Sequence, residues 1–223
     1  MPGRLTLLYQ SHSPYARKVL VCAHELGLAE RLDVVHHETS PTNRNDAVFA
    51  ANPLGKVPVL LTSDAGALFD STVICDYLDR LGGAGSLVPR DGPARYEALR
   101  LQALAQGLCD AGIALRWETV RRPEAQRYPP LAQGQAAKLL EAYDHLEGQA
   151  QFAGQVAAGQ VTNDQVTIGQ IALATALAWL EFRDMPDFRK RAPRLAAWHD
   201  AFCRRASMQA TPYDGETQDG APR

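Results

Sequence analysis

Residues 4–28 read RLTLLYQSHSPYARKVLVCAHELGL and contain the turn from which the rest of the fold can be worked out. The apolar run over residues 4–9 predicts a short β-strand. Apolar residues at helical spacing follow it and predict a helix over residues 14–28, with Gly27 as its stop. Ser13, which is followed by proline, is typical of a helix N-cap, because its hydroxyl accepts from backbone N–H groups that lack a partner.

Short apolar runs and helical stretches continue to alternate up to residue 81. The expected elements are a strand over Leu32–His36, a helix over Asn45–Ala51, strands over Val57–Leu61 and Ala67–Phe69, and a helix over Ser71–Leu81. With the first strand and helix, the order is β-α-β-α-β-β-α. This order predicts an α+β domain over residues 1–81.

The rest of the chain predicts helices alone. A Gly- and Pro-rich linker over residues 82–93 (GGAGSLVPRDGP) leads to an all-α domain over residues 94–208. Its expected helices are Ala94–Arg121, Leu131–Gln149 after a stop at Pro129-Pro130, the nearly all-apolar Thr167–Arg183 as a buried central helix, and Pro193–Arg205. Residues 209–223 form a polar tail that either wraps the surface or is disordered.

Two features of the helical half have local structural meaning. Thr167 followed three residues later by Gln170 predicts a capping box at the start of the central helix. Gly107, in the first long helix, marks either a close crossing with another helix or a wall of a binding site.

Composition excludes several classes of function. The 223 residues carry 23 Lys and Arg against 25 Asp and Glu, a net charge of −2, which does not fit nucleic-acid binding through bulk positive charge. No apolar run reaches the ~20 residues of a membrane helix, and the first residues lack a signal-peptide pattern. The four cysteines form no C-x-x-C motif, so neither a metal site nor a redox dithiol is expected. We expect a cytoplasmic protein with no membrane and no nucleic-acid partner.

Three stretches carry candidate chemistry, each beside a purely structural interpretation. Ser13 is a helix cap, or it also donates a hydrogen bond to a thiolate held at the positive end of the helix. The Val57-Pro58 bond, in NPLGKVPVL at 52–60, belongs to an ordinary turn, or it is cis and presents the Val57 backbone to an extended peptide. Asp70 and Ser71 cap a helix, or they bind the ammonium and carboxylate groups of a ligand.

Taken together, these motifs resemble the cytosolic glutathione S-transferase family, and in particular its bacterial, YibF-like members with a serine in the first turn. The similarity includes SPYARKV at 13–19, NPLGKVPVL at 52–60, DSTVICDYL at 70–78, the buried helix at 167–183 and PRLAAW at 193–198. It implies a thioredoxin-like N-terminal domain followed by an all-helical C-terminal domain, which is the glutathione transferase fold. It also implies glutathione as co-substrate and a homodimer.

The resemblance assigns the thiol chemistry to Ser13, whose hydroxyl would favour the glutathione thiolate. Glutaredoxins have a cysteine at this position and form a mixed disulfide, whereas serine leaves the glutathione sulfur free to attack another molecule. A free thiol with a pKa near 8.5 is only a few per cent ionised at neutral pH, and lowering that pKa by about two corresponds to about 2.7 kcal/mol. Ser11 is the alternative hydroxyl, since some classes use a serine nearer the strand.

The remaining contacts to glutathione are also implied by the resemblance. Val57, presented by cis-Pro58, would pair its backbone with the cysteinyl part. Ser71 would bind the γ-glutamyl carboxylate and Asp70 its ammonium group, while Lys56 would reach the glycyl carboxylate. Many relatives have glutamate in place of Asp70, which is one methylene shorter.

The expected reaction is attack of the glutathione thiolate on a small hydrophobic electrophile. Two alternatives stay open: a glutathione-dependent isomerase, dehalogenase or peroxidase that uses the same site, and a non-catalytic binding protein with this fold. The architecture of the family suggests walls for the electrophile from the Gln10–His12 loop and from Gly107, Asp110, Ala111, Ala114 and Trp117.

Overall fold

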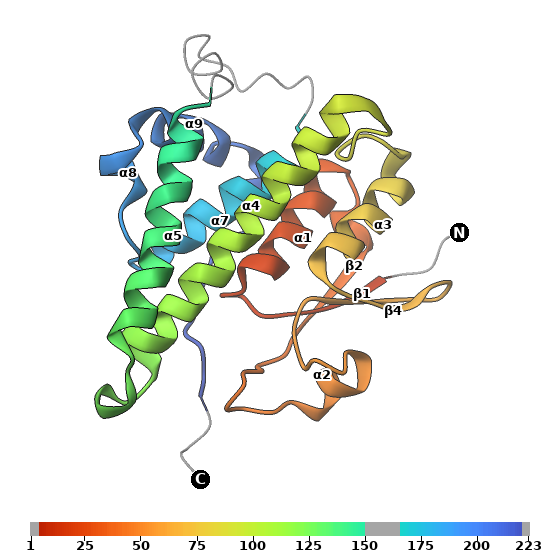
Figure 1. Ribbon diagram of the computed structural model, residues 1–223. Helices are drawn as coiled ribbons and strands as arrows, with labels where there is room; N and C mark the ends of the chain where they lie inside the picture. Colours follow the sequence, from red (N-terminus) through yellow and green to blue (C-terminus); the bar gives the residue numbers. More distant parts are fainter. Residues whose placement is uncertain (1–4, 150–165, 220–223) are drawn as a thin grey trace. The chain divides into compact units, whose positions relative to one another are not determined.

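The computed structural model describes residues 5–149 and 166–219, which divide into two compact units (Figure 1). The N-terminal unit comprises Met1–Arg95 together with Gln209–Arg223, and the helical unit comprises Tyr96–Met208. In the part of the chain that is described, no helix has both the length and the apolar character needed to cross a membrane.

The N-terminal unit is built on a four-stranded sheet with the order β2-β1-β3-β4. Its strands are β1 (Leu5–Tyr9), β2 (Leu32–His36), β3 (Val59–Thr62) and β4 (Gly66–Leu68). Strand β1 is parallel to β2 and antiparallel to β3, and β3 is antiparallel to β4. The predicted β-α-β-α-β-β-α order and the thioredoxin-like fold are therefore confirmed.

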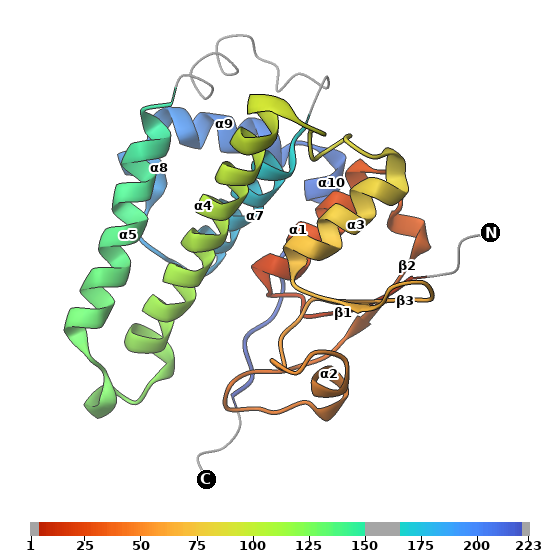
Figure 2. The same ribbon diagram turned by 45° about the vertical axis from the view of Figure 1, so that its right-hand side comes forward.

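Helices cover both faces of this sheet. Helices α1 (Pro14–Glu25) and α3 (Ser71–Gly83) lie together on one face, and α2 (Asp46–Ala51) lies on the other (Figure 2). Under α2, the buried side chains of Leu8, Val48, Val57 and Val59 form a small apolar core. A short 3-10 turn, Ala29–Arg31, precedes β2.

Helix α1 ends three residues before the predicted limit. Leu26 is its C-cap, and Gly27 has a φ of 66°, a left-handed conformation that glycine adopts without strain. The backbone N–H of Leu28 then donates to the carbonyl of Ala23 at 2.8 Å. Gly27 is thus the stop that the sequence predicts.

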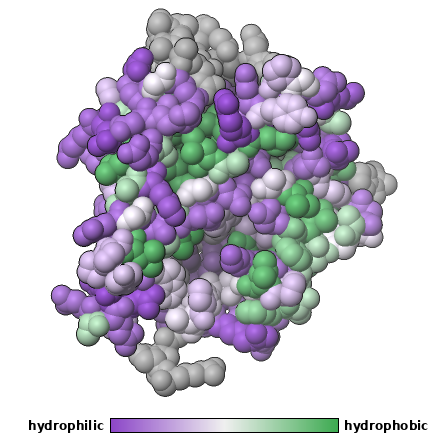
Figure 3. All heavy atoms as spheres, in the orientation of Figure 1, coloured by the Kyte–Doolittle hydropathy of each residue, from purple (hydrophilic) through white to green (hydrophobic). Residues whose placement is uncertain are grey.

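The helical unit is built around one buried helix. It contains α4 (Gly92–Arg116), a π-helical turn (Trp117–Arg121), a 3-10 turn (Glu124–Gln126), α5 (Pro129–Glu147), α7 (Ile168–Phe182), α8 (Phe188–Arg191), α9 (Pro193–Cys203) and α10 (Ala206–Gln209). Helix α7 is almost entirely buried, as its apolar composition predicts. Hydrophilic side chains cover most of the face seen in Figure 3, with smaller apolar patches between them.

Two predictions in this half are corrected, and one short helix was not predicted. Pro129 and Pro130 do not stop a helix but begin α5, where a missing N–H removes no helical hydrogen bond. The helix expected up to Arg121 changes to π-helical geometry at Trp117. Helix α8 has only four residues, too few for a periodic pattern.

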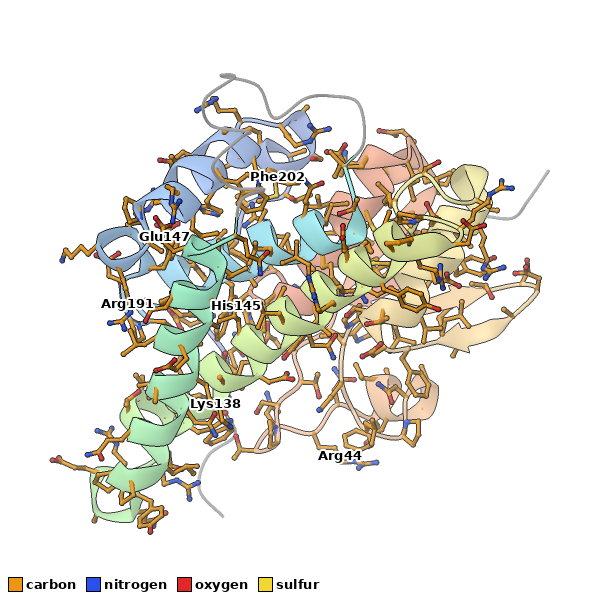
Figure 4. The ribbon with its side chains drawn as sticks, turned by 45° about the horizontal axis from the view of Figure 1, so that its top comes forward. Arg44, Lys138, His145, Glu147, Arg191 and Phe202 are labelled. Carbon is orange, nitrogen blue, oxygen red and sulfur yellow. The ribbon has the colours of Figure 1, made fainter. Side chains whose placement is uncertain are left out.

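Helices α5, α8 and α9 are joined by ion pairs. Arg191 donates to Asp144 at 2.6 and 2.7 Å, and Arg194 donates to Glu147 at 2.9 Å. Figure 4 labels Glu147 on α5 and Arg191 on α8. Each pair is partly exposed, so solvent screens the attraction and the contribution of each pair to stability is small.

Close helix crossings occur at two glycines other than Gly107. A Cβ atom added to Gly169 of α7 would lie 2.5 Å from the carbonyl oxygen of Ala98 on α4, and one added to Gly112 would lie 2.8 Å from Leu180. A Cβ atom on Gly107 would meet no described atom within 4 Å. The close-crossing interpretation of Gly107 is therefore wrong.

Candidate functional site

The three candidate motifs meet at one end of the sheet in the N-terminal unit. Leu8 near the end of β1 pairs with Val59 at the start of β3, and Leu60 pairs with Leu68 at the end of β4. Because β3 is antiparallel to both neighbours, the C-terminal end of β1, the N-terminal end of β3 and the C-terminal end of β4 lie at the same end of the sheet. The N-termini of α1 and α3 and the Val57-Pro58 bond are thereby brought together.

Ser13 is the N-cap of α1, and its hydroxyl has a free donor. The hydroxyl oxygen accepts from the backbone N–H of Ala16 at 3.2 Å, and the residue is 7% exposed. Among the described residues, the hydroxyl hydrogen has no acceptor. No acidic residue occupies the first turn of α1, so no carboxylate of that turn competes for the positive end of the helix.

The alternative serine is engaged differently. The Ser11 hydroxyl donates at 2.8 Å to the backbone carbonyl of Asp214, in the C-terminal segment. Its hydrogen is thus already used within the chain, whereas that of Ser13 is available. The geometry favours Ser13 over Ser11 as a donor to a bound sulfur.

The Val57-Pro58 peptide bond is cis, as the family resemblance implies. Both residues are buried, while Lys56 beside them is exposed. The loop before this bond is shaped by Asn52, whose side chain donates to the Lys56 carbonyl at 2.9 Å and accepts from the backbone N–H of Leu54 at 3.0 Å.

Two buried polar residues connect this loop to the turn before α1. The Gln10 side chain donates to the carbonyl of Thr39 at 3.0 Å, and the Thr39 hydroxyl donates to the carbonyl of Gly55 at 3.0 Å. The sequence analysis did not identify Asn52, Gln10 or Thr39 as residues that position this loop. An Asn followed by Pro is a known turn signal and marks Asn52, but the contacts of Gln10 and Thr39 leave no local pattern.

Asp70 and Ser71, the two candidate residues at the start of α3, differ in their hydrogen bonds. Asp70 is the N-cap, and its carboxylate accepts from the backbone N–H of Thr72 at 2.9 Å. Ser71 is buried, and its hydroxyl has no hydrogen-bond partner among the described residues. A buried hydroxyl without a partner is unfavourable by itself and points to a ligand group that completes it.

Family models match both halves of the chain. The model described as glutathione S-transferase, N-terminal domain, matches residues 12–81, and the model for the C-terminal domain matches residues 102–201. An Escherichia coli K12 protein named uncharacterized GST-like protein YibF is 33% identical over 77% of this chain and 79% of its own length. The chain belongs to the glutathione S-transferase family.

Solved structures of this family agree with that assignment. A glutathione transferase family member from Pseudomonas fluorescens Pf-5, crystallised with bound glutathione, is 38% identical with a TM-score of 0.84, over 95% of this chain and all of its own. A glutathione S-transferase from Methylobacillus flagellatus KT, also with glutathione bound, is 33% identical with a TM-score of 0.76, over 93% and 98% of the two chains. All three candidate motifs lie within the match to the transferase N-terminal domain.

Two of the four cysteines pack inside the N-terminal unit and are closed to solvent. Cys22 and Cys75 are completely or almost completely buried between α1 and α3, and burial raises the pKa of the Cys22 thiol. A buried thiol with a raised pKa is a poor nucleophile at neutral pH. All four cysteines are free thiols.

The suggested electrophile walls in α4 are mixed in character. Gly107 and Asp110 are exposed, and Ala111 is buried inside the helical unit. Trp117 lies in the π-helical turn, where the Arg121 guanidinium is 3.8 Å from the centre of its ring. A wall formed by these residues remains a prediction.

Proposed function

We propose that this protein binds glutathione in its N-terminal unit and uses Ser13 to stabilise the thiolate for attack on a small hydrophobic electrophile. The observation that carries the proposal is the free hydroxyl hydrogen of Ser13 at the N-terminus of α1. A charge-assisted hydrogen bond and the helix dipole both favour an anion at this place. The thiolate sulfur would form a bond to an electrophilic carbon, and the leaving group would depart with its electron pair.

The other contacts follow the family pattern, and the local geometry supports them. The Ser71 hydroxyl, which lacks a partner among the described residues, would bind the γ-glutamyl carboxylate, and Asp70 would face the ammonium group. Val57 beside cis-Pro58 would pair with the cysteinyl backbone, and the exposed Lys56 would reach the glycyl carboxylate.

The proposal includes a cellular setting and an assembly. Four free thiols fit the reducing conditions of the cytoplasm, where we place the protein. We further propose a homodimer, as expected of its family. Sedimentation of the purified protein tests the dimer directly.

A titration of bound glutathione tests the thiolate step. Thiolate absorbance in the ultraviolet is followed against pH for the wild type and for Ser13→Ala. The wild type should show bound thiolate at neutral pH, and the variant should bind glutathione but require a pH about two units higher. Equal titration of both proteins would reject Ser13 as the stabilising group and make Ser11→Ala the next variant.

The same experiment separates the alternatives. If the wild type binds no glutathione, the protein is not a transferase and a binding or assembly role takes its place. If it binds and ionises glutathione, parallel assays with an alkyl halide, a hydroperoxide and a cis-enone acid distinguish conjugation or dehalogenation, peroxide reduction and isomerisation.

A further inference from the structure

The C-terminal segment 211–219 lies against the N-terminal unit near the start of α1. The Ser11 hydroxyl donates to the Asp214 carbonyl at 2.8 Å, and the Asp214 N–H donates to the Ser11 carbonyl at 3.4 Å. In Figures 1 and 2 this segment passes the N-terminal end of α1 and continues toward the loop between β2 and α2. Residues about 200 positions apart in the sequence are thus joined by hydrogen bonds in both directions.

The far end of the segment is held by the loop that follows β2. The Asp219 carboxylate accepts from the hydroxyls of Ser40 at 3.1 Å and Thr42 at 2.6 Å. The Asn43 side chain donates to the Gln218 carbonyl at 3.3 Å. The segment is therefore anchored at two places, one on each side of its middle residues.

The first anchor places an aromatic ring beside the proposed thiol site. The Arg17 guanidinium lies 4.3 Å from the centre of the Tyr213 ring, and Arg17 itself is buried. Arg17 follows Ser13 by four positions, so the two residues occupy the same side of the first helical turn, and the Arg17 N–H donates to the Ser13 carbonyl at 3.0 Å. Tyr213 is only partly buried, which leaves part of the ring accessible.

A ring in this position has a definite chemical consequence. A partly exposed tyrosine presents a flat apolar surface, and another aromatic ring packs on it more favourably than an alkyl group does. Arg17 fixes one side of the ring through a cation–π contact, so the ring is ordered before a ligand arrives. Asp214, the residue after Tyr213, is hydrogen-bonded to Ser11, which precedes Ser13 by two positions, so the ring is held close to the proposed thiol site.

We propose that Tyr213 is a specificity-determining residue that favours planar aromatic electrophiles. Segment 211–219 positions its ring beside the proposed thiol site. This inference rests on the proposed function of Ser13 and adds the class of substrate. Discrimination comes from the ring, and the hydrogen bonds of Ser11 and Asp219 hold the ring in position.

Binding of non-reactive conjugates tests the inference without turnover. Dissociation constants for S-benzylglutathione and S-methylglutathione are measured by calorimetry on the full chain. Tyr213→Ala should weaken binding of the benzyl conjugate about three- to tenfold and leave that of the methyl conjugate within twofold. Tyr213→Phe keeps the ring and should keep the preference. Asp219→Ala, which removes the acceptor for Ser40 and Thr42, should give a smaller loss in the same direction.

Tyr128→Ala is the matched control, because Tyr128 is an exposed tyrosine of the other unit and should change neither constant. If Tyr213→Ala weakens both conjugates equally, or neither, the specificity role is rejected while glutathione binding stands. If the wild type binds neither conjugate, the proposed function itself is wrong and the inference falls with it.

Discussion

Helices α1 and α7 both begin with a hydroxyl residue at the N-cap, but only at α7 does a side chain return a hydrogen bond to the capping residue. At α7, Thr167 accepts from the N–H of Gln170, and the Gln170 side chain accepts in return from the Thr167 N–H at 2.9 Å. At α1, the residue in the place of Gln170 is Ala16, which has no polar side chain to reciprocate.

This difference separates a structural helix start from one that is available for ligand binding. The Thr167 hydroxyl lies 3.5 Å from Gln170 Oε1, so its hydrogen has an acceptor within the cap. The Ser13 hydroxyl hydrogen has none among the described residues. Gly169 also packs directly on α4, so no ligand group fits against the first turn of α7. The residue three positions after the cap is therefore more informative than the cap itself.

The largest effect is expected on turnover when each cap is removed in turn. Ser13→Ala should lower kcat/KM for glutathione conjugation about 100-fold at pH 6, equivalent to about 2.7 kcal/mol if the pKa of the bound thiol rises by two. Thr167→Ala removes a hydroxyl from the closed start and should leave kcat/KM within twofold. Equal losses in the two variants would show that cap stability, and not thiolate stabilisation, limits the rate.

The next effect concerns the packing that closes the start of α7. Gly169→Ala should destabilise the protein by about 2 kcal/mol, because the new Cβ would lie 2.5 Å from a backbone oxygen of α4. Urea unfolding measures the loss. Gly107→Ala is the control: it is a helical position with open space and should stabilise by about 0.5–1 kcal/mol. A neutral Gly169→Ala would mean that α4 and α7 can move apart at little cost.

The sequence predicts those parts of the fold and site that depend on near neighbours. The Ser13 cap, the Gly27 stop and the capping box of α7 each involve residues within a few positions, and all three are found. The contacts Arg17–Tyr213 and Ser11–Asp214 join residues about 200 positions apart, and no local pattern encodes them. The start of α5 could also have been predicted, because proline at the first helical position is a known signal for the beginning of a helix. Pro129 and Pro130 were instead interpreted as a helix stop.

We expect low pH to destabilise the helical unit through the side chain of His199, which is on α9 and contacts the Ala174 carbonyl of α7. His199 is buried, and its Nε2 atom lies 3.2 Å from the Ala174 carbonyl; burial lowers the pKa of His199, while Glu181 acts to raise it and Arg189 to lower it. The unfolded chain then binds a proton first as the pH falls. The stability contribution of His199 is therefore complete well above pH 6.5 and is lost as the pH falls below that value.

Urea unfolding at a series of pH values measures this slope, and His199→Gln should remove it, because glutamine does not titrate. The hydrogen bond from Arg191 lowers the pKa of the Asp144 carboxyl group. Burial acts to raise the pKa of Glu147, but hydrogen bonds from the Leu195 N–H and from Arg194 lower it overall, so both carboxylates lose their contributions only at more acidic pH. A slope that persists in His199→Gln would assign the acid sensitivity to another group.

The smallest effect isolates the capping box itself. Gln170→Ala should destabilise the protein by about 0.5 kcal/mol, because the Thr167 N–H loses its acceptor while the Thr167 hydroxyl still caps the helix. In the double variant with Thr167→Ala the two losses should not add, since each bond orders the residue that makes the other. Chemical unfolding of the four proteins gives this coupling. Additive losses would mean that the reciprocal bonds are independent. In that case the N-terminus of α1 would differ from that of α7 only by lacking the acceptor that Gln170 supplies. A glutamine three residues after an N-cap would then not be evidence against ligand binding at that end of a helix.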